Sequence, residues 1–149
     1  MNFRIMFTLF VSALSLAALA EDNLQSRSVI HFPNEKVAAA FATGTPLLVT
    51  NNFKVQTGNR TGPGEVEIHE HDTDIFYILE GSATFVTGGK ALEPKLIGPG
   101  ETRARSITGG EERSLTKGDV IVIPKGVPHW FKAVKGHVLY YVVKVTSCT

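Results

Sequence analysis

The sequence predicts an all-β domain, a sandwich or barrel, preceded by one short helix. Two observations support this fold class. From Pro46 onward, short apolar or alternating runs are separated by Gly- and Pro-containing turns at regular intervals, which is typical of many short strands. No second helical run of comparable length follows the first, so a sheet of alternating strands and helices is not expected. The length of 149 residues fits a single domain.

The predicted helix covers residues 34–42, which are rich in helix-forming residues. Pro33 stands at its beginning and Gly44 just after its end, an asymmetry that is common in helices. Val37, Ala40 and Phe41 fall on one face, and we expect that face to pack against the body of the domain.

The predicted strands follow the helix at short intervals. They cover residues 46–50, 53–57, 65–71, 75–79, 83–87, 120–123, 129–134 and 138–145. The segment 90–117 between the fifth and sixth of them is rich in Lys, Arg and Glu. It is interpreted either as an extra hairpin that forms a lid, with an arginine that holds a substrate carboxylate or phosphate, or as a solvated loop. For the individual arginines the solvated interpretation is favoured, because glutamates largely balance their charge.

The first twenty residues are predicted to be a secretory signal peptide. Arg4 supplies a positive charge, residues 5–20 are apolar or small, and Ala18 and Ala20 form a small-residue cleavage signal. An uncleaved membrane anchor is the alternative, but the apolar run is short for a span of about 20 residues. We therefore expect a domain of residues 21–149 that is secreted or periplasmic and has no stable membrane anchor after cleavage.

Charge and cysteine content narrow the choice of partners. Fifteen Lys and Arg residues face fourteen Asp and Glu residues, and loss of Arg4 with the leader leaves fourteen against fourteen. Without a basic stripe, nucleic acid is not an expected partner. Cys148 is the single cysteine, so no internal disulfide can form, and we interpret it as an unpaired thiol near the end of the chain.

Three histidines and one aspartate are the candidate metal ligands. His69 and His71 lie two positions apart in a predicted strand, so they are expected to face the same side. Asp74 follows after a short bend, and His129 follows a Pro- and Gly-containing turn after residues 120–123. Three imidazoles and a carboxylate suit a divalent transition metal (Mn, Fe, Co, Ni, Cu or Zn) better than calcium or magnesium. Such a site leaves one or two positions open on the metal.

The two segments that carry these residues resemble the paired motifs of the cupin superfamily. The second motif matches at Gly118, Pro124, Gly126 and His129, with Ala133 where Asn is usual. The first motif matches at His69, His71 and Gly81. Its departures are Gly64, one residue closer to His69 than usual, and Asp74 in the place of a glutamate, only two residues after His71. Asp74 could therefore ligate directly or through a water, or not at all, with Asp72 as the alternative ligand.

The resemblance implies a jelly-roll barrel, a double-stranded β-helix, with the metal in the barrel mouth and a homodimeric assembly. It also implies diverse activities, among them those of oxygenases, isomerases and lyases, alongside non-enzymatic binders. The fold alone therefore does not select a function.

Glu67 is a possible catalytic acid or base, because it lies two positions before His69 on the same face. A solvated glutamate in an acidic stretch is the alternative. Phe76, Ile78 and Phe131 are expected inside the barrel, with Tyr77 and Trp130 outside it, where they either form a subunit interface or pack under the helix.

Three functions remain open from the sequence. The first is a metal-dependent enzyme that acts on a small organic molecule outside the cytoplasm. The second is a non-catalytic barrel that binds a small molecule or a metal, and the third is a structural secreted oligomer.

Overall fold

The computed structural model describes residues 28–147. The predicted signal peptide and Cys148 lie outside these residues. The predicted boundary between leader and domain at residue 20 lies outside them as well, and so it stays a prediction.

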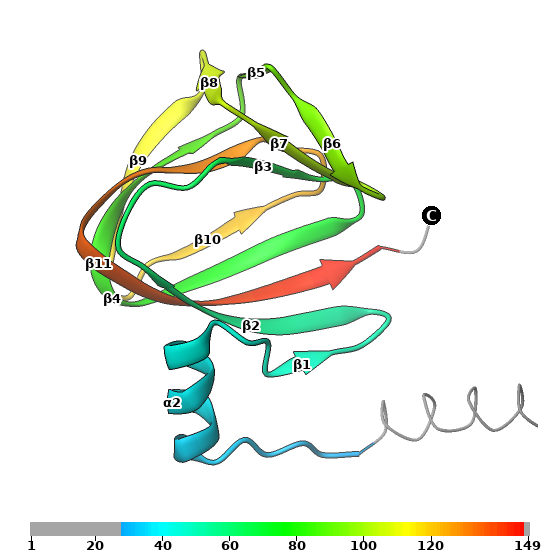
Figure 1. The fold of residues 1–149 in the computed structure, drawn as a ribbon, viewed down its shortest axis with the longest axis vertical. Coiled ribbons are helices and arrows are strands. Elements are labelled where there is room, and N and C mark those ends of the chain that lie inside the picture. The colour runs from blue at the N-terminus through cyan, green and yellow to red at the C-terminus, as the bar shows by residue number, and fades with distance from the viewer. Residues whose placement is uncertain (1–27, 148–149) are drawn as a thin grey trace, which may run out of the picture. The chain divides into compact units, whose positions relative to one another are not determined.

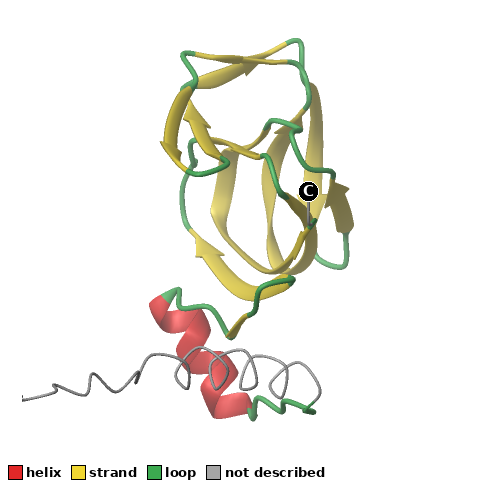
Figure 2. Cartoon of the chain, turned by 90° about the vertical axis from the view of Figure 1, so that its right-hand side faces the viewer, coloured by secondary structure: helices red, strands yellow, loops and turns green. Residues whose placement is uncertain are grey.

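Helix α2, Asn34–Thr43, confirms the predicted helix and is one residue longer. It ends where Gly44 adopts the left-handed conformation (φ 69°) and donates its backbone N–H to the carbonyl of Ala40 at 2.8 Å, which caps the last turn. The ring of Phe41 packs edge-on against Tyr141, 5.2 Å between centroids. The helix lies against the outside of the barrel beside β2 (Figures 1 and 2). Within residues 28–147 no helix combines the length and the apolar character that a membrane span requires.

The strands form one large antiparallel sheet and a separate short hairpin in the described part of the chain. The large sheet contains β1 (Leu48–Val49), β2 (Phe53–Arg60), β3 (Val66–His69), β4 (Asp72–Thr87), β6 (Lys95–Gly98), β7 (Glu101–Ala104), β9 (Glu111–Thr116), β10 (Val120–Ile123) and β11 (His129–Thr146). The hairpin consists of β5 (Lys90–Leu92) and β8 (Ser106–Thr108). The segment 90–117 therefore consists mostly of strands, as the hairpin interpretation expected, and not of a loop.

The large sheet closes into a barrel because β4 and β11 bend and serve two walls each. The strand order β1-β2-β11-β3-β7-β6 runs through β11, while β4 pairs with β11, β9 and β10. Figure 1 shows β11 curving from the wall that contains β3 and β7 to the wall that contains β2 and β4. This arrangement confirms the expected jelly-roll barrel.

β4 and β11 each join two strands that the sequence separates. Gly81 was expected to end a strand, but β4 continues through it with φ 77°. The register between the strands shifts opposite this point, between Lys135 and Val138. Gly81 lies so close to the carbonyl of His137 that a side chain would collide with it. The glycine therefore forms a bulge that bends the pair, and not a turn that separates strands.

The bulges also decide which residues of β11 enter the barrel. Before them, His129 and Phe131 are buried, whereas after them Val138, Tyr140 and Val142 are buried. The burial phase changes from odd to even residue numbers because the register shifts displace the alternation.

Aromatic rings fill the core beneath the site. Phe76, Ile78 and Phe131 are all buried, which confirms their predicted interior positions. Phe131 and Tyr140 stack with 5.1 Å between centroids. The Tyr140 ring lies directly over Gly58 on the neighbouring strand, where a side chain would overlap the ring. Gly58 therefore allows Tyr140 to lie flat along the barrel wall.

Asp72 ties the start of β4 to two other strands, and its charge should make stability depend on pH. Its carboxylate is 5% exposed and accepts hydrogen bonds from Lys54 Nζ of β2 at 2.9 Å and from Thr146 Oγ1 of β11 at 2.7 Å. Burial acts to raise the pKa of Asp72, but these hydrogen bonds and the Lys54 and Lys144 charges outweigh burial and lower it. Because the pKa is lower in the folded state, the ionised form stabilises the protein above about pH 4. That stabilisation is lost as the pH falls further.

We expect Asp72→Asn to lower the free energy of unfolding by about 1–2 kcal/mol at pH 7, because hydrogen bonds to a charged group are lost. Urea unfolding at pH 7 and pH 3 measures this difference, which should shrink at the lower pH. Glu112→Gln, at an exposed ion pair with Lys132, should change stability by less than about 0.5 kcal/mol. An equal loss for Asp72→Asn at both pH values would contradict the assignment.

Candidate metal centre

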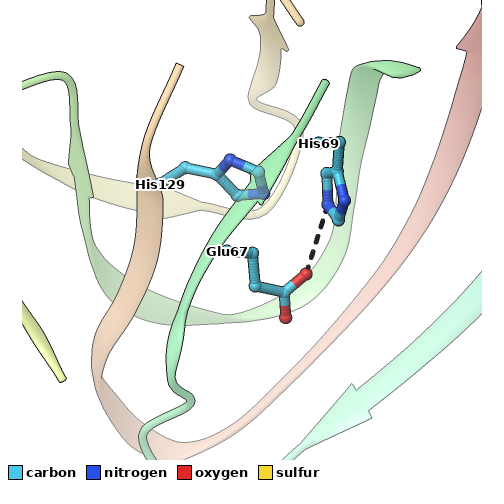
Figure 3. A group of neighbouring side chains, drawn as sticks. All are labelled: Glu67, His69 and His129. Carbon is cyan, nitrogen blue, oxygen red and sulfur yellow. Dashed lines mark ion pairs between the residues drawn. The ribbon is translucent and has the colours of Figure 1, made fainter. Parts of the chain in front are cut away.

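Two imidazoles meet inside the barrel because β3 ends beside the start of β11. His129 pairs with Glu67 in the ladder between these strands, and His69 is the last residue of β3. Both imidazoles are buried, with exposed fractions of 4% for His69 and 3% for His129, and their ring centroids are 5.2 Å apart. Figure 3 shows Glu67, His69 and His129 pointing toward one another. One ligand atom from each lies within 4.8 Å of the others, so this group can hold a metal ion.

The Nδ1 atoms of both rings already have hydrogen-bond partners. His69 Nδ1 lies 2.7 Å from Glu101 Oε2, and His129 Nδ1 lies 3.1 Å from the backbone carbonyl of Val127. A carbonyl and a carboxylate can only accept, so each Nδ1 carries a hydrogen. In the neutral rings, both Nε2 atoms then present lone pairs to the centre. Protein metal sites orient histidine ligands in this way, with the second nitrogen bound to a carboxylate or a carbonyl.

His129 presents a ligand atom that needs a partner. Its Nε2 is buried and has no hydrogen-bond partner among the described residues. Burial lowers the pKa of His129, and this outweighs the opposing effects of the Val127 hydrogen bond and the carboxylates of Asp74 and Glu67. The ring is therefore held neutral, which is the form that binds metals.

Glu67 is an ionised carboxylate at neutral pH. Burial acts to raise its pKa, but the hydrogen bond with His69 and the positive charge of Arg103 are the main effects that outweigh burial and lower the pKa to about 2. Arg60 NH2 and Arg103 NH2 each lie 3.8 Å from one of its oxygens. An ionised Glu67 suits the role of a metal ligand or a base, and not that of an acid.

Asp74 lies beside the group, and its charge is paired with Lys144. The carboxylate is 1% exposed, and its Oδ2 is 3.4 Å from His69 Nε2 and 3.6 Å from His129 Nε2. Lys144 Nζ donates to the same oxygen at 2.6 Å and lies 2.8 Å from His69 Nε2. Asp74 Oδ1 is buried and has no hydrogen-bond partner among residues 28–147. Metal ligation by Asp74 stays a prediction, and the alternative ligand, Asp72, is occupied by Lys54 and Thr146.

Acidic neighbours raise the pKa of His69 above its usual value, and the ring offers its Nε2 lone pair in the neutral form. Burial acts to lower its pKa, as does the charge of Lys144, but the hydrogen bond with Glu67 and the charges of Asp74 and Glu101 outweigh them and raise the pKa.

His71 lies outside this group. β3 ends at His69, and the chain bends at residues 70 and 71, so the strand alternation behind the His69/His71 pair stops one residue too early. The His71 side chain is exposed and packs against Gly100, while its backbone carbonyl accepts a hydrogen bond from Ser147. The structure therefore brings together Glu67, His69 and His129, with Asp74 beside them, and leaves His71 at the surface.

A pocket of about 140 Å³ opens next to the group. Its charged lining residues are Arg60, Glu65, Glu67, Asp74 and Lys144, and its aromatic ones are Phe76, Phe131 and Tyr140. The Arg60 guanidinium lies over the Phe131 ring, 5.1 Å from the centroid. The pocket is small beside the usual range of about 300–1,000 Å³, so it suits a ligand of few atoms.

The profile of the family described as Cupin matches residues 23–147. The chain belongs to the cupin family. The cupin fold is also found in solved structures with low sequence identity. A Bacillus halodurans protein, BH2720, gives a TM-score of 0.55 at 14% identity, with 83% of each chain covered. The cupin domain of Schizosaccharomyces pombe Cnp3 gives 0.51 at 16% identity, covering 70% of this chain and 60% of that one.

The chain spans only part of some larger relatives. It is similar to an 11S globulin from Wrightia tinctoria (TM-score 0.48, 15% identity), with 64% of this chain and 21% of the globulin covered. A comparison with curated protein sequences gives no match.

Four charged residues near the candidate site lie outside the two sequence motifs. Arg60, Glu101 and Arg103 come from β2 and β7, and Lys144 comes from the end of β11. Lys144 carries a signal in the sequence, because it is the one charged residue in the otherwise apolar run 138–145. Arg103 had been assigned to a solvated segment, but it lies beside Glu67.

Glu101 should control how strongly His69 binds a metal. We expect Glu101→Gln to weaken zinc binding by about 10–100-fold, because the carboxylate that fixes the ring and raises its basicity is lost. Isothermal titration with Zn²⁺ measures the change. Glu70→Gln is the matched control, since Glu70 is exposed and adjacent to His69 in sequence. Unchanged affinity in Glu101→Gln would show that this contact does not orient the ligand.

Proposed function

We propose that this cupin binds one divalent transition metal (Mn, Fe, Co, Ni, Cu or Zn) through Glu67, His69 and His129. The observation that carries the proposal is the convergence of the two imidazoles and the carboxylate. Both Nδ1 atoms form hydrogen bonds to groups outside this cluster, which leaves the Nε2 atoms facing its centre. The buried, unpartnered Nε2 of His129 supports the fit, because leaving such an atom unpaired costs about 1–3 kcal/mol unless it binds something.

We further propose that the cupin is a metal-dependent enzyme of oxygenase, isomerase or lyase type that acts on a small organic molecule. A bound metal would supply Lewis acidity, or redox chemistry with dioxygen if it is iron or copper. The residues of the chain would do the rest. Phe76, Phe131 and Tyr140 would shield the reactants from water, Arg60 would pair with an anionic group, and ionised Glu67 would accept a proton if it is not a ligand.

The alternative is a barrel that binds its ligand without converting it. The pocket supports both functions, because a binder needs the same small, polar cavity. Glu67→Gln does not separate the two, since Glu67 is part of the group that can hold the metal.

Export and dimerisation also remain proposals. The leader-like sequence of residues 1–20 supports action outside the cytoplasm. A homodimer is supported by exposed apolar side chains on neighbouring strands, with Tyr77 of β4 opposite Val120 of β10, and Val122 two residues further on. Trp130 instead donates its Nε1–H to the carbonyl of Gly64 at 2.6 Å.

Metal content is the direct test of the ligand set. Purified without chelators or a histidine tag, the wild type should carry close to one metal per chain by mass spectrometry, whereas His69→Ala and His129→Ala should carry almost none. His71→Ala should keep its metal, because its side chain is at the surface.

Loss of metal in His71→Ala would return that residue to the ligand set. A wild type that is empty, and whose melting temperature does not rise with added metals, would contradict the metal site itself.

Turnover separates the enzyme from the binder. We expect the metal-loaded protein, incubated with an excess of small carboxylic acids and sugars, to convert many molecules of one compound per chain. Mass spectrometry of the mixture and oxygen uptake measure this conversion, and His69→Ala is the control. A compound that is retained by the protein but recovered unchanged would favour the non-catalytic barrel.

A further inference from the structure

Lys144 places a cation where the candidate metal ligands converge. The residue lies on β11 directly opposite Asp74 of β4, and its side chain is only 13% exposed. Its Nζ is 2.6 Å from Asp74 Oδ2 and 2.8 Å from His69 Nε2. Asp74 is almost fully buried, so the lysine supplies a charge that the interior requires.

The contact with His69 uses a particular lone pair. In the neutral ring of His69, which carries its hydrogen on Nδ1, Nε2 has a free lone pair. An ammonium group can only donate hydrogen bonds, so this Nε2 accepts from Lys144 Nζ at 2.8 Å. The other ring nitrogen, Nδ1, is bound to Glu101. A metal held by Glu67, His69 and His129 would need the same Nε2 lone pair, because Nδ1 faces away from the group.

We propose that the Lys144 ammonium is a built-in occupant of this site, which a metal ion must displace from His69 before it binds. The proposal rests on the proposed metal site and concerns what controls its occupancy. Lys144 holds the site in a compact, charge-balanced form without metal, and it lowers the apparent affinity for any metal that enters.

The displaced lysine has an acceptor available. Asp74 Oδ2 already accepts from Nζ, and in the described part of the chain Asp74 Oδ1 is buried with no hydrogen-bond partner. Lys144 also lines the adjacent pocket, which gives the amine room to move. The ammonium can therefore leave His69 while it stays paired with Asp74.

Competition of this kind selects among metals. Only an ion that gains more from imidazole than the ammonium does can displace it, so copper, nickel and zinc should enter more readily than manganese. Magnesium and calcium, which prefer oxygen ligands, should not enter.

The test is a Zn²⁺ titration of the full chain and of Lys144→Met by calorimetry. We expect the variant to bind at least about tenfold more tightly, the factor that corresponds to loss of one hydrogen bond to a charged group. Arg103→Met is the control for loss of a positive charge, because Arg103 lies 3.8 Å from Glu67 and 3.4 Å from Glu101 but does not contact His69 Nε2. Its gain in affinity should be clearly smaller. Lys54→Met, at the neighbouring Asp72 pair, should bind as the wild type does.

The outcomes separate this proposal from the proposed function. A variant that binds zinc while the wild type stays empty would support the displacement and contradict a resident metal. Equal affinity of wild type and Lys144→Met, a gain no larger than that of Arg103→Met, or no binding by either protein would overturn the displacement.

A measurement on the wild type guards against a variant that fails to fold. The side-chain ammonium signals of nitrogen-15-labelled lysines are followed by NMR as Zn²⁺ is added. The Lys144 signal should shift in proportion to bound zinc, and the Lys54 signal should stay in place. A Lys144 signal unchanged in the zinc-bound protein would overturn the proposal.

Discussion

The pairing of β4 with β11 is the constraint on which the rest of the structure depends. The two strands run together from Asp72 opposite Thr146 to Thr87 opposite His129, and they bend together at the bulge around Gly81. The bend carries β11 from one wall of the barrel to the other. At one end of the β4–β11 pair, His129 therefore lies beside β3. At the other end, Lys144 lies opposite Asp74. A shift of this register by one residue would turn both side chains to the opposite face.

Charge balance is the second constraint on the site. A carboxylate as deeply buried as Asp74 is costly unless a cation or several hydrogen bonds compensate it. Around it, the barrel holds two imidazoles and the ionised Glu67, with Arg60 and Arg103 at the margin. This surplus of acceptors makes a positive species at the centre favourable, whether it comes from the chain or from solution. If Lys144 occupies the site as proposed, the affinity for a metal would be the difference in free energy between the lysine-occupied and the metal-occupied site.

The sequence predicts the barrel and singles out Glu67, His69 and His129, because those features follow local rules. Glu67 follows from the strand alternation two positions before His69. The strand rhythm and the helix caps reflect turn chemistry, and His69 and His129 belong to spaced motifs. These local rules fail at His71. Its side chain was predicted to face the barrel interior on the assumption that the strand continues for two residues beyond His69. Hydrogen bonding between Glu70 and Gly100, and between Ser147 and His71, holds the bend instead. Glu101 and Lys144 could not be assigned from the sequence, because their roles arise from pairing between strands that are far apart along the chain.

The support of His69 by β7 separates two properties of the candidate site. One is the identity of the ligands, and the other is the strength with which they donate to a metal. The candidate ligand atoms lie on β3 and β11, whereas the carboxylate that binds the Nδ1 of His69 lies in the segment connecting the two motifs. Substitutions in that connection can adjust the donor strength of the imidazole while every ligand stays the same. Two cupins with identical ligands but different connecting hairpins would then differ in the metals they retain. In such proteins, the connecting segment is the part to exchange when metal preference is to be redesigned without altering the barrel.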